Sequence, residues 1–204
     1  MTRRLLLAIL VLLLSGCASV SAGVFQQGRS PTCEYRGQSG TPVVILEAQA
    51  VPSATLLPCV KLLPTGWSVS DVFIHNGRAR FTLDSDRVGP HAVTVVLERY
   101  CQLPRVTRVP SDEPGTRRYE QIGEVRPGVG FTGTRFYLFP GGCVTYRFKF
   151  RGEEQAEPIG DVTLAVSFVT RDAIRKHVRQ DTGGRAELDP PAQGASPRPA
   201  PRQS

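Results

Sequence analysis

Alternating apolar and polar residues on both sides of Asn76-Gly77 predict a β-hairpin. Asn-Gly is favoured at the centre of a two-residue type I′ turn, because both positions need a positive φ. With His75 opposite Arg78, one face of the hairpin is almost entirely apolar, and Ser70 would lie opposite Leu83. Side chains alternate between the faces of a strand, so the turn and the pattern support the same register.

A second alternation predicts another hairpin, built from residues 134–139 and 143–150 around the turn residues 140–142. With Phe139 opposite Cys143, we expect most of the aromatic and aliphatic side chains to share the core face. The opposite face then gathers basic and aromatic side chains, and arginine forks suit phosphate and carboxylate groups. This face is the candidate site for an anionic ligand, and its members are Arg135, Tyr137, Arg147, Lys149 and Arg151.

Shorter apolar patterns predict the elements between these hairpins. Consecutive apolar residues indicate a buried strand at residues 41–48, and one-sided apolar spacing indicates a short helix at residues 54–63. Residues 92–100 favour a third strand, and residues 119–125 favour a short edge strand. The proline-containing segment 102–118 between them is typical of a long exposed loop.

The C-terminal part of the predicted domain holds a strand and a helix. Alternation over residues 161–168 indicates a strand, and Thr170 can cap a helix that follows. One longer helix over residues 161–180 fits this Val-rich stretch equally well. The predicted fold class is α+β: an antiparallel β-sheet of five or six strands, with a short helix near residue 58 and a C-terminal helix near residue 175. A β-sandwich is the alternative.

The N-terminus has the order of a secretory signal peptide. Arg3 and Arg4 precede an unbroken apolar run at residues 5–14, and small residues follow at positions 15–19. As a helix, the ten-residue run would span only about 15 Å, against roughly 30 Å of bilayer hydrocarbon. The run therefore predicts export rather than a membrane span.

The end of this leader, Leu14-Ser15-Gly16-Cys17, resembles the lipobox of bacterial lipoprotein precursors. The resemblance implies that Cys17 carries a thioether-linked diacylglycerol, that cleavage occurs before Cys17, and that the new N-terminus is often acylated, commonly with palmitate. Two or more acyl chains are enough for stable anchoring. We therefore expect a lipid-anchored protein on the extracytoplasmic face of the cell membrane. The Arg-rich composition makes the exported domain similar to envelope proteins of GC-rich, actinobacterium-like bacteria.

This interpretation divides the chain into four parts. Residues 1–16 are a signal peptide, residues 17–32 a lipidated tether, residues 33–182 a single disulfide-stabilised globular domain, and residues 183–204 a disordered tail rich in Pro and Arg. Removal of residues 1–16 takes away two arginines and no acids, so the formal net charge falls from +7 to +5. A moderately basic exported domain favours anionic partners.

Four cysteines remain once Cys17 is assigned to lipid. An even set in an oxidising compartment predicts two disulfides, and the spacing contains no Cys-x-x-Cys pair typical of a metal site. In an up-and-down antiparallel sheet, the expected ends of the strands favour Cys33 with Cys101 and Cys59 with Cys143 over the sequential pairing.

The sequence contains no catalytic motif of the metalloprotease, serine hydrolase, β-lactamase or P-loop type. It predicts no metal site and no cofactor. We therefore expect a non-catalytic envelope lipoprotein that acts as a binding or assembly module. A lipoprotein that binds an anionic small molecule, lipid or wall polymer is the alternative, and a wall-modifying enzyme is the third. The expected partners are the membrane, through Cys17, and an anionic headgroup, a polymer or another envelope protein, but not nucleic acid.

Overall fold

The computed structural model describes residues 24–25, 30–36, 41–126, 130–152 and 156–188. Cys17, the predicted signal peptide, most of the predicted tether and most of the predicted tail lie outside these residues. The elements in chain order are β1 (Val24–Phe25), α2 (Val43–Ala50), β2 (Leu56–Val60), β3 (Trp67–His75), β4 (Arg78–Ser85), β5 (Gly89–Glu98), β6 (Thr107–Val109), β7 (Arg117–Arg126), β8 (Gly130–Phe139), β9 (Gly142–Arg151), α3 (Ala156–Ala165), β10 (Val166–Thr170) and α4 (Arg171–Asp181).

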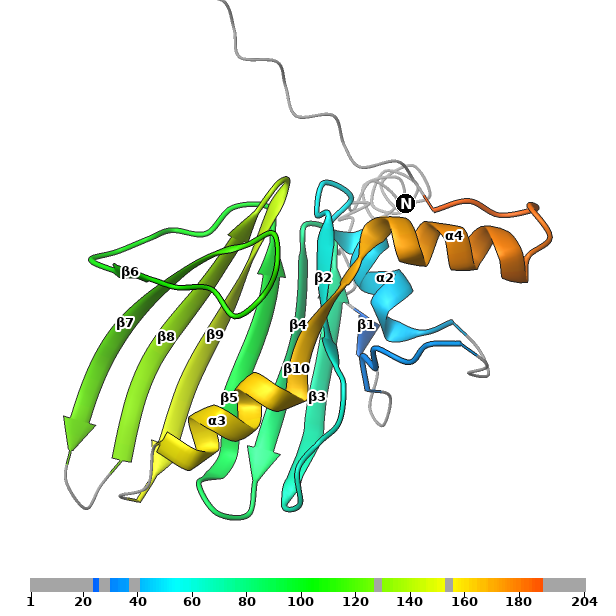
Figure 1. Cartoon of the computed structure of the whole chain (residues 1–204). Coiled ribbons are helices and arrows are strands. Elements are labelled where there is room, and N and C mark those ends of the chain that lie inside the picture. The colour runs from blue at the N-terminus through cyan, green and yellow to red at the C-terminus, as the bar shows by residue number, and fades with distance from the viewer. Residues whose placement is uncertain (1–23, 26–29, 37–40, 127–129, 153–155, 189–204) are drawn as a thin grey trace, which may run out of the picture.

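In the described part of the chain, eight strands form one antiparallel sheet in the order β1-β3-β4-β5-β9-β8-β7-β6 (Figure 1). The α+β class is confirmed, but the sheet has eight strands rather than five or six. Two additions explain the difference: β1 on one edge and β6 on the other. Strand β6 lies within the segment predicted as a loop.

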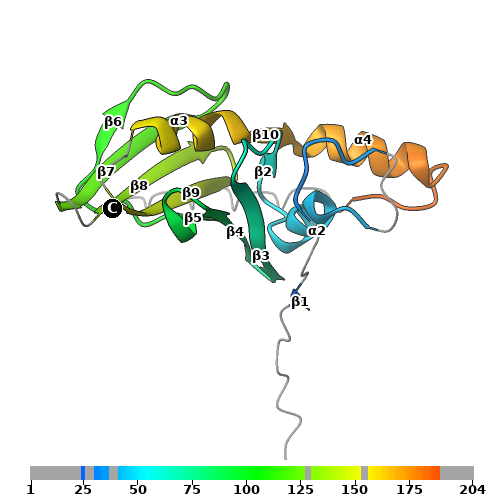
Figure 2. The same ribbon diagram turned by 90° about the horizontal axis from the view of Figure 1, so that it is seen from below.

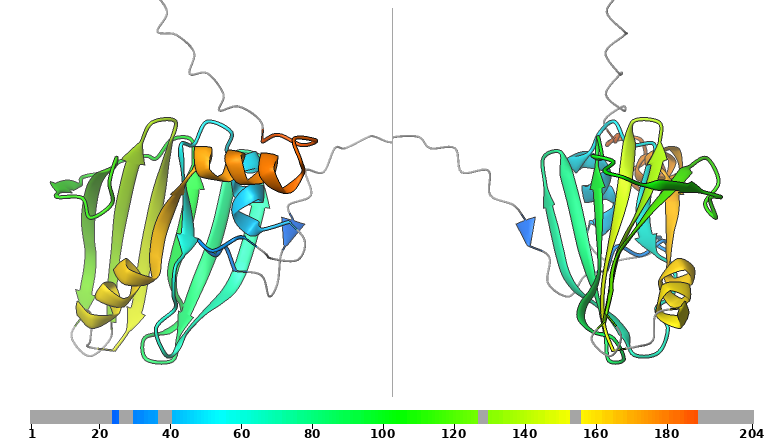
Figure 3. Two further views of the ribbon diagram at one scale, coloured as in Figure 1. Left: turned by 45° about the vertical axis from the view of Figure 1, so that its right-hand side comes forward. Right: turned by 90° about the vertical axis from the view of Figure 1, so that its left-hand side faces the viewer.

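The helices and a second, two-stranded sheet lie on one face of the large sheet (Figures 2 and 3). Strands β2 and β10 pair antiparallel in this layer, with Val166 opposite Val60. We call the covered side of the large sheet the inner face and the opposite side the outer face. The core lies between the inner face and this layer, where Phe81, Leu97 and Val162 are fully buried. The second sheet is too small to make the fold a β-sandwich.

The first hairpin forms as predicted near its turn and differs from the prediction further along. His75 lies opposite Arg78 and Val72 opposite Phe81. A β-bulge between Val69 and Asp71 then shifts the register, so that Val69 rather than Ser70 lies opposite Leu83. The bulge lets an apolar side chain face Leu83.

Two predictions in the segment before this hairpin are wrong in opposite directions. Residues 43–50 form helix α2 rather than a strand, and residues 56–60 form strand β2 rather than a helix near residue 58. Short apolar runs do not distinguish a buried strand from a buried helix by periodicity. Pro58, which lacks an N–H, is tolerated in β2 because this strand lies in a sheet of only two strands.

The C-terminal prediction is correct for the helix and wrong for the extent of the strand. Residues 156–165 form helix α3, and strand β10 begins only at Val166. Helix α4 then begins directly after Thr170, whose hydroxyl accepts a hydrogen bond from the backbone N–H of Ala173 at 3.2 Å. This is the predicted N-cap. None of the described helices is both long enough and apolar enough to cross a membrane.

The presence of two disulfides is confirmed, but the predicted pairing is wrong. Cys33 is bonded to Cys59, and Cys101 to Cys143. Cys33 lies beside strand β2 because its N–H donates to the carbonyl of Val60 at 2.9 Å. Cys101 follows β5, which pairs directly with β9 and places Cys143 opposite Glu98. The prediction assumed neighbouring strands in sequence order and therefore put Cys143 at the wrong end of the sheet.

Candidate functional site

The register of the β8–β9 hairpin divides the predicted anion-binding face between the two sides of the sheet. Phe139 pairs with Gly142 and Leu138 with Cys143, one residue away from the predicted register. The turn therefore contains only Pro140 and Gly141, and Gly141 has a φ of 77°. Pro at the first and Gly at the second turn position fit this geometry. A shift of one residue moves every side chain of a strand to the other face.

Strand β8 carries its two predicted site residues to the inner face as a result. Arg135 is 5% exposed and Tyr137 is 2% exposed. Strand β9 keeps Arg147, Lys149 and Arg151 on the outer face, where all three are exposed. The structure thus brings together three of the five residues predicted for the anionic ligand, and it places the other two in a separate environment.

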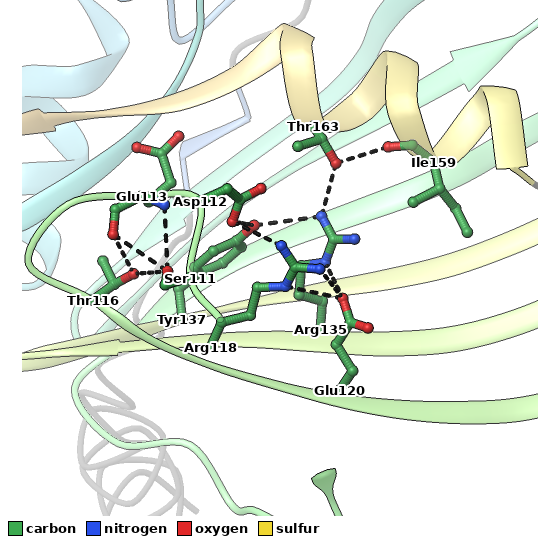
Figure 4. Close-up of polar contacts among 10 residues, drawn as sticks. All are labelled: Ser111, Asp112, Glu113, Thr116, Arg118, Glu120, Arg135, Tyr137, Ile159 and Thr163. Atoms are coloured by element: carbon green, nitrogen blue, oxygen red, sulfur yellow. Dashed lines mark hydrogen bonds and ion pairs between the residues drawn. The ribbon is translucent and has the colours of Figure 1, made fainter. Parts of the chain in front are cut away.

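That separate environment is a polar network on the inner face, shown in Figure 4. The guanidinium of Arg135 donates to Glu120 Oε1 at 2.8 Å and to Thr163 Oγ1 of helix α3 at 2.8 Å. Arg118 also contacts Glu120, at 2.8 Å. The charged groups of β7 and β8 are therefore bonded directly to one another and to α3.

Tyr137 connects this network to the loop before β7. Its hydroxyl donates to Asp112 Oδ1 at 2.9 Å, and Arg118 contacts the same oxygen at 3.0 Å (Figure 4). Partial burial raises the pKa of Asp112, but the hydrogen bonds from Tyr137, the backbone and Arg118 outweigh it, so the pKa is lowered. Burial raises the pKa of Tyr137, which keeps its hydroxyl protonated as a donor.

The network is electrically balanced. Arg118 and Arg135 face Glu120 and Asp112, so two positive groups meet two negative groups. A balanced, largely buried network leaves no excess positive charge for an anionic ligand. We assign Arg135 and Tyr137 to the structural attachment of the 110–116 loop and helix α3 to the sheet, and remove them from the candidate binding face.

The same loop carries a second carboxyl close to the network. Ser111 Oγ and Thr116 Oγ1 share a hydrogen bond at 2.6 Å, and both oxygens lie within hydrogen-bond distance of the carbonyl of Glu113 (Figure 4). Partial burial raises the pKa of the Glu113 carboxyl, although a hydrogen bond from Ser167 opposes the shift. These contacts fix the turn of the loop over the inner face.

The candidate site is the outward row Arg147, Lys149 and Arg151, which we call the β9 ladder. Arg147 lies between Thr94 on β5 and Thr134 on β8, and Lys149 pairs with Thr132. Within the described residues, no ladder member forms an ion pair with a carboxylate. Alternate residues of a strand are about 7 Å apart, so the ladder presents regularly spaced cationic groups that no carboxylate of the described residues neutralises.

A hollow of about 630 Å³ adjoins the ladder at Arg147. The segment after β5 forms one wall, with Tyr100 and Gln102, while Thr134 and Phe136 contribute from β8. The Cys101–Cys143 disulfide holds that segment against the outer face. Sequence reasoning missed this wall because the sequence does not show that Cys101 lies next to the start of β9.

The described residues contain no group of three or more His, Cys, Asp or Glu side chains placed to hold a metal ion. Searches against protein-family models, curated proteins and solved structures found no match for this chain.

Proposed function

We propose that the protein is a lipid-anchored, non-catalytic binding module of the cell envelope, and that its β9 ladder holds a linear anionic polymer. The lipobox-like Leu14-Ser15-Gly16-Cys17 supports the anchor and the extracytoplasmic location. The observation that carries the ligand class is the ladder itself: three cationic side chains on one strand, all exposed, with threonines or glycine opposite them in the flanking strands.

The geometry of the ladder favours a polymer over a small molecule. A compact anion is usually bound where several donors converge in a pocket. Here the cationic groups extend in a line over about 14 Å, two spacings of about 7 Å each. A chain with repeating phosphodiester or carboxylate groups can contact all three residues at once, and arginine forks match both groups.

The anchor is tested by replacing the cysteine. Cys17→Ala should release the protein from the membrane fraction or leave an uncleaved precursor, because the attachment point for diacylglycerol is lost. Membrane fractionation and the intact mass of the protein measure both effects. Unchanged processing together with unchanged membrane retention would contradict lipidation at Cys17.

The ligand class is tested with poly(glycerol phosphate) and with monomeric glycerol phosphate as probes. Arg147→Gln and Lys149→Gln should each weaken polymer binding about tenfold at low salt, since a hydrogen bond to a charged group contributes on the order of 1.5 kcal/mol. The double substitution Lys176→Gln with Arg185→Gln removes two exposed cations elsewhere and serves as the control. Equal weakening by the control, or equal affinity for polymer and monomer, would refute the assignment.

A second candidate is an assembly module that docks another envelope protein. Tyr100 is 74% exposed and Leu103 is 38% exposed on the segment beside the hollow. Exposed aromatic side chains are enriched in protein interfaces. Crosslinking at the cell surface, with the captured component identified as polymer or protein, separates the two candidates.

A further inference from the structure

The position of strand β1 defines where the N-terminal part of the chain meets the domain. Val24 pairs with Ile74 and Phe25 with Phe73, so β1 is antiparallel to β3. Strand β3 runs toward the turn at Asn76-Gly77. The N-terminal end of β1 therefore points toward that same end of the sheet.

We call this end of the molecule the hairpin-tip end. This end is defined by one row of paired residues that crosses the sheet. The row consists of Arg78, Glu98, Cys143, Leu138 and Arg117, each paired with the next. The turns at residues 76–77 and 140–141 lie just beyond this row, at the top of Figure 1.

The spacing between Cys17 and Val24 is only seven residues, much shorter than the tether of residues 17–32 expected from the sequence. Seven extended residues reach at most about 24 Å. Val24 lies two residues, or about 7 Å, from the hairpin tip, but about 20 Å from the opposite turn at the end of β4. An anchor on Cys17 therefore favours the hairpin-tip end near the membrane, because the chain between Cys17 and Val24 has to extend less than it would for the opposite end.

The surface at the hairpin-tip end has the chemistry of a membrane interface. Arg99 and Arg117 are exposed there, and Tyr100 is 74% exposed. The Arg99 guanidinium lies over the Tyr100 ring, 5.0 Å from its centroid. Arg99, Tyr100 and Arg117 also line one hollow of about 520 Å³. Tyrosine is enriched at headgroup level, and basic side chains are attracted to anionic leaflets.

The opposite end of the molecule carries acidic side chains. Asp84 lies near the end of β4 and Asp86 in the β4–β5 connection, and Glu157 and Asp161 of helix α3 both contact Arg87. Because Arg87 and Arg151 lie at this end as well, charge alone does not set the orientation, which rests on the attachment point of the chain and on the exposed Tyr100.

We propose that the hairpin-tip end rests on an anionic lipid surface, with Arg99 and Arg117 at the headgroups and Tyr100 at the interface. This orientation rests on the lipid anchor of the proposed function. It directs the β9 ladder away from the membrane, because β9 begins at Gly142 near the lipid and ends at Arg151 far from it. The bilayer and the polymer then contact different parts of one domain.

Fluorescence quenching tests the orientation in the full lipidated chain. The protein is placed in vesicles that contain phosphatidylglycerol with brominated acyl chains. Tyr100→Trp introduces an indole at the proposed contact, and Leu164→Trp introduces one at a site of similar exposure, 76%, on helix α3. Leu164 lies just before the start of β10. The end of β10 lies at the hairpin-tip end, near Thr55 and Pro140, so Leu164 lies away from that end. Native Trp67, 7% exposed, is present in both variants as an internal reference.

The indole from Tyr100→Trp should show blue-shifted emission and quenching, whereas that from Leu164→Trp should show neither. Adding Arg99→Gln and Arg117→Gln should lower the ratio of docked to undocked protein about 30-fold, at about 1 kcal/mol for each basic side chain. The matched pair Lys149→Gln with Arg151→Gln removes the same charge from the distant end of the ladder and should leave quenching unchanged.

Quenching of the Leu164→Trp variant to the same extent, or of neither variant, would overturn the orientation. Intact mass separates this result from failure of the proposed function. A protein without lipid on Cys17 refutes the anchor and the orientation together, whereas a lipidated protein without quenching refutes the orientation alone. Polymer binding by the ladder is measured independently of the anchor and of the orientation.

Discussion

Arg135 Nε donates to Glu120 Oε1 at 2.8 Å across the β7–β8 pair, and the Arg135 side chain is only 6% exposed. Removing the carboxylate would leave a buried guanidinium without its main negative partner. Glu120→Ala should therefore lower the free energy of unfolding by about 3 kcal/mol. Denaturant titration measures this change, and Arg147→Ala on the exposed face should change it by less than about 0.5 kcal/mol. Equal effects of the two substitutions would show that the network does not stabilise the sheet.

The buried carboxyl of Glu47 should give the free energy of unfolding an unusual dependence on pH. It lies on helix α2 with 1% exposure, and its Oε2 has no hydrogen-bond partner among the described residues. Burial raises its pKa well above 4.5. The folded state therefore keeps the proton to higher pH than the unfolded state, so this group's contribution is fully present below about pH 4.5 and is lost as the pH rises toward the folded pKa.

Glu47→Met should remove this loss and raise the free energy of unfolding at pH 7, because it replaces a buried ionisable group with an apolar side chain of similar size. Thermal unfolding at a series of pH values measures the slope. The same substitution at Glu187, whose side chain is 64% exposed, is the control and should leave the slope intact. An unchanged slope in Glu47→Met would assign the pH dependence to other groups.

The Cys101–Cys143 disulfide should stabilise the domain by restricting the unfolded chain. The bonded cysteines are 42 residues apart, and the loop-entropy relation gives about 4 kcal/mol for such a loop. Cys101→Ser with Cys143→Ser should lower the free energy of unfolding by about that amount and release the wall of the hollow.

Peptide mapping under non-reducing conditions should recover the Cys33–Cys59 and Cys101–Cys143 peptides from the native protein. A Cys33–Cys101 peptide would contradict the structure.

The two hairpin glycines provide a matched pair of substitutions. Gly77 and Gly141 both have positive φ, 85° and 77°. A methyl group at Gly77 would meet no atom within 4 Å, whereas one at Gly141 would lie 1.8 Å from the carbonyl oxygen of Ser53. Gly77→Ala should cost about 1–2 kcal/mol of backbone strain, and Gly141→Ala clearly more. Thermal unfolding compares them, and equal losses would mean that the close approach to Ser53 does not constrain the turn.

The features predicted correctly from sequence are those governed by neighbouring residues. Asn76-Gly77 fixes its own turn, and the Thr170 hydroxyl reaches a backbone N–H three residues away. The pairing of Cys143 failed because it depends on which strands are neighbours in the sheet, and local patterns contain no information about that order. The exchange of helix and strand before residue 61 has a similar cause, since tertiary packing decides the structure of short apolar runs.

The candidate site was only partly predictable for one reason. Arg147, Lys149 and Arg151 share a face in either register of the hairpin, because they lie on one strand. Whether Arg135 joins them depends on the turn being two residues long instead of three. The charged partner that makes the buried position of Arg135 favourable, Glu120, lies on β7, which the sequence indicated only as a short edge strand.

The brevity of strand β1 has a mechanical consequence. Under the proposed anchor at Cys17, a pulling force on the domain would act first on the pairing of Val24 and Phe25 with β3. If that pairing opens, the next hydrogen bond to the domain among the described residues is at Pro31, whose carbonyl accepts from Val60 N–H at 2.7 Å. The segment between Cys17 and its first attachment to the domain would double from seven to fourteen residues, which reach about 48 Å, while the disulfide-bonded domain stayed folded.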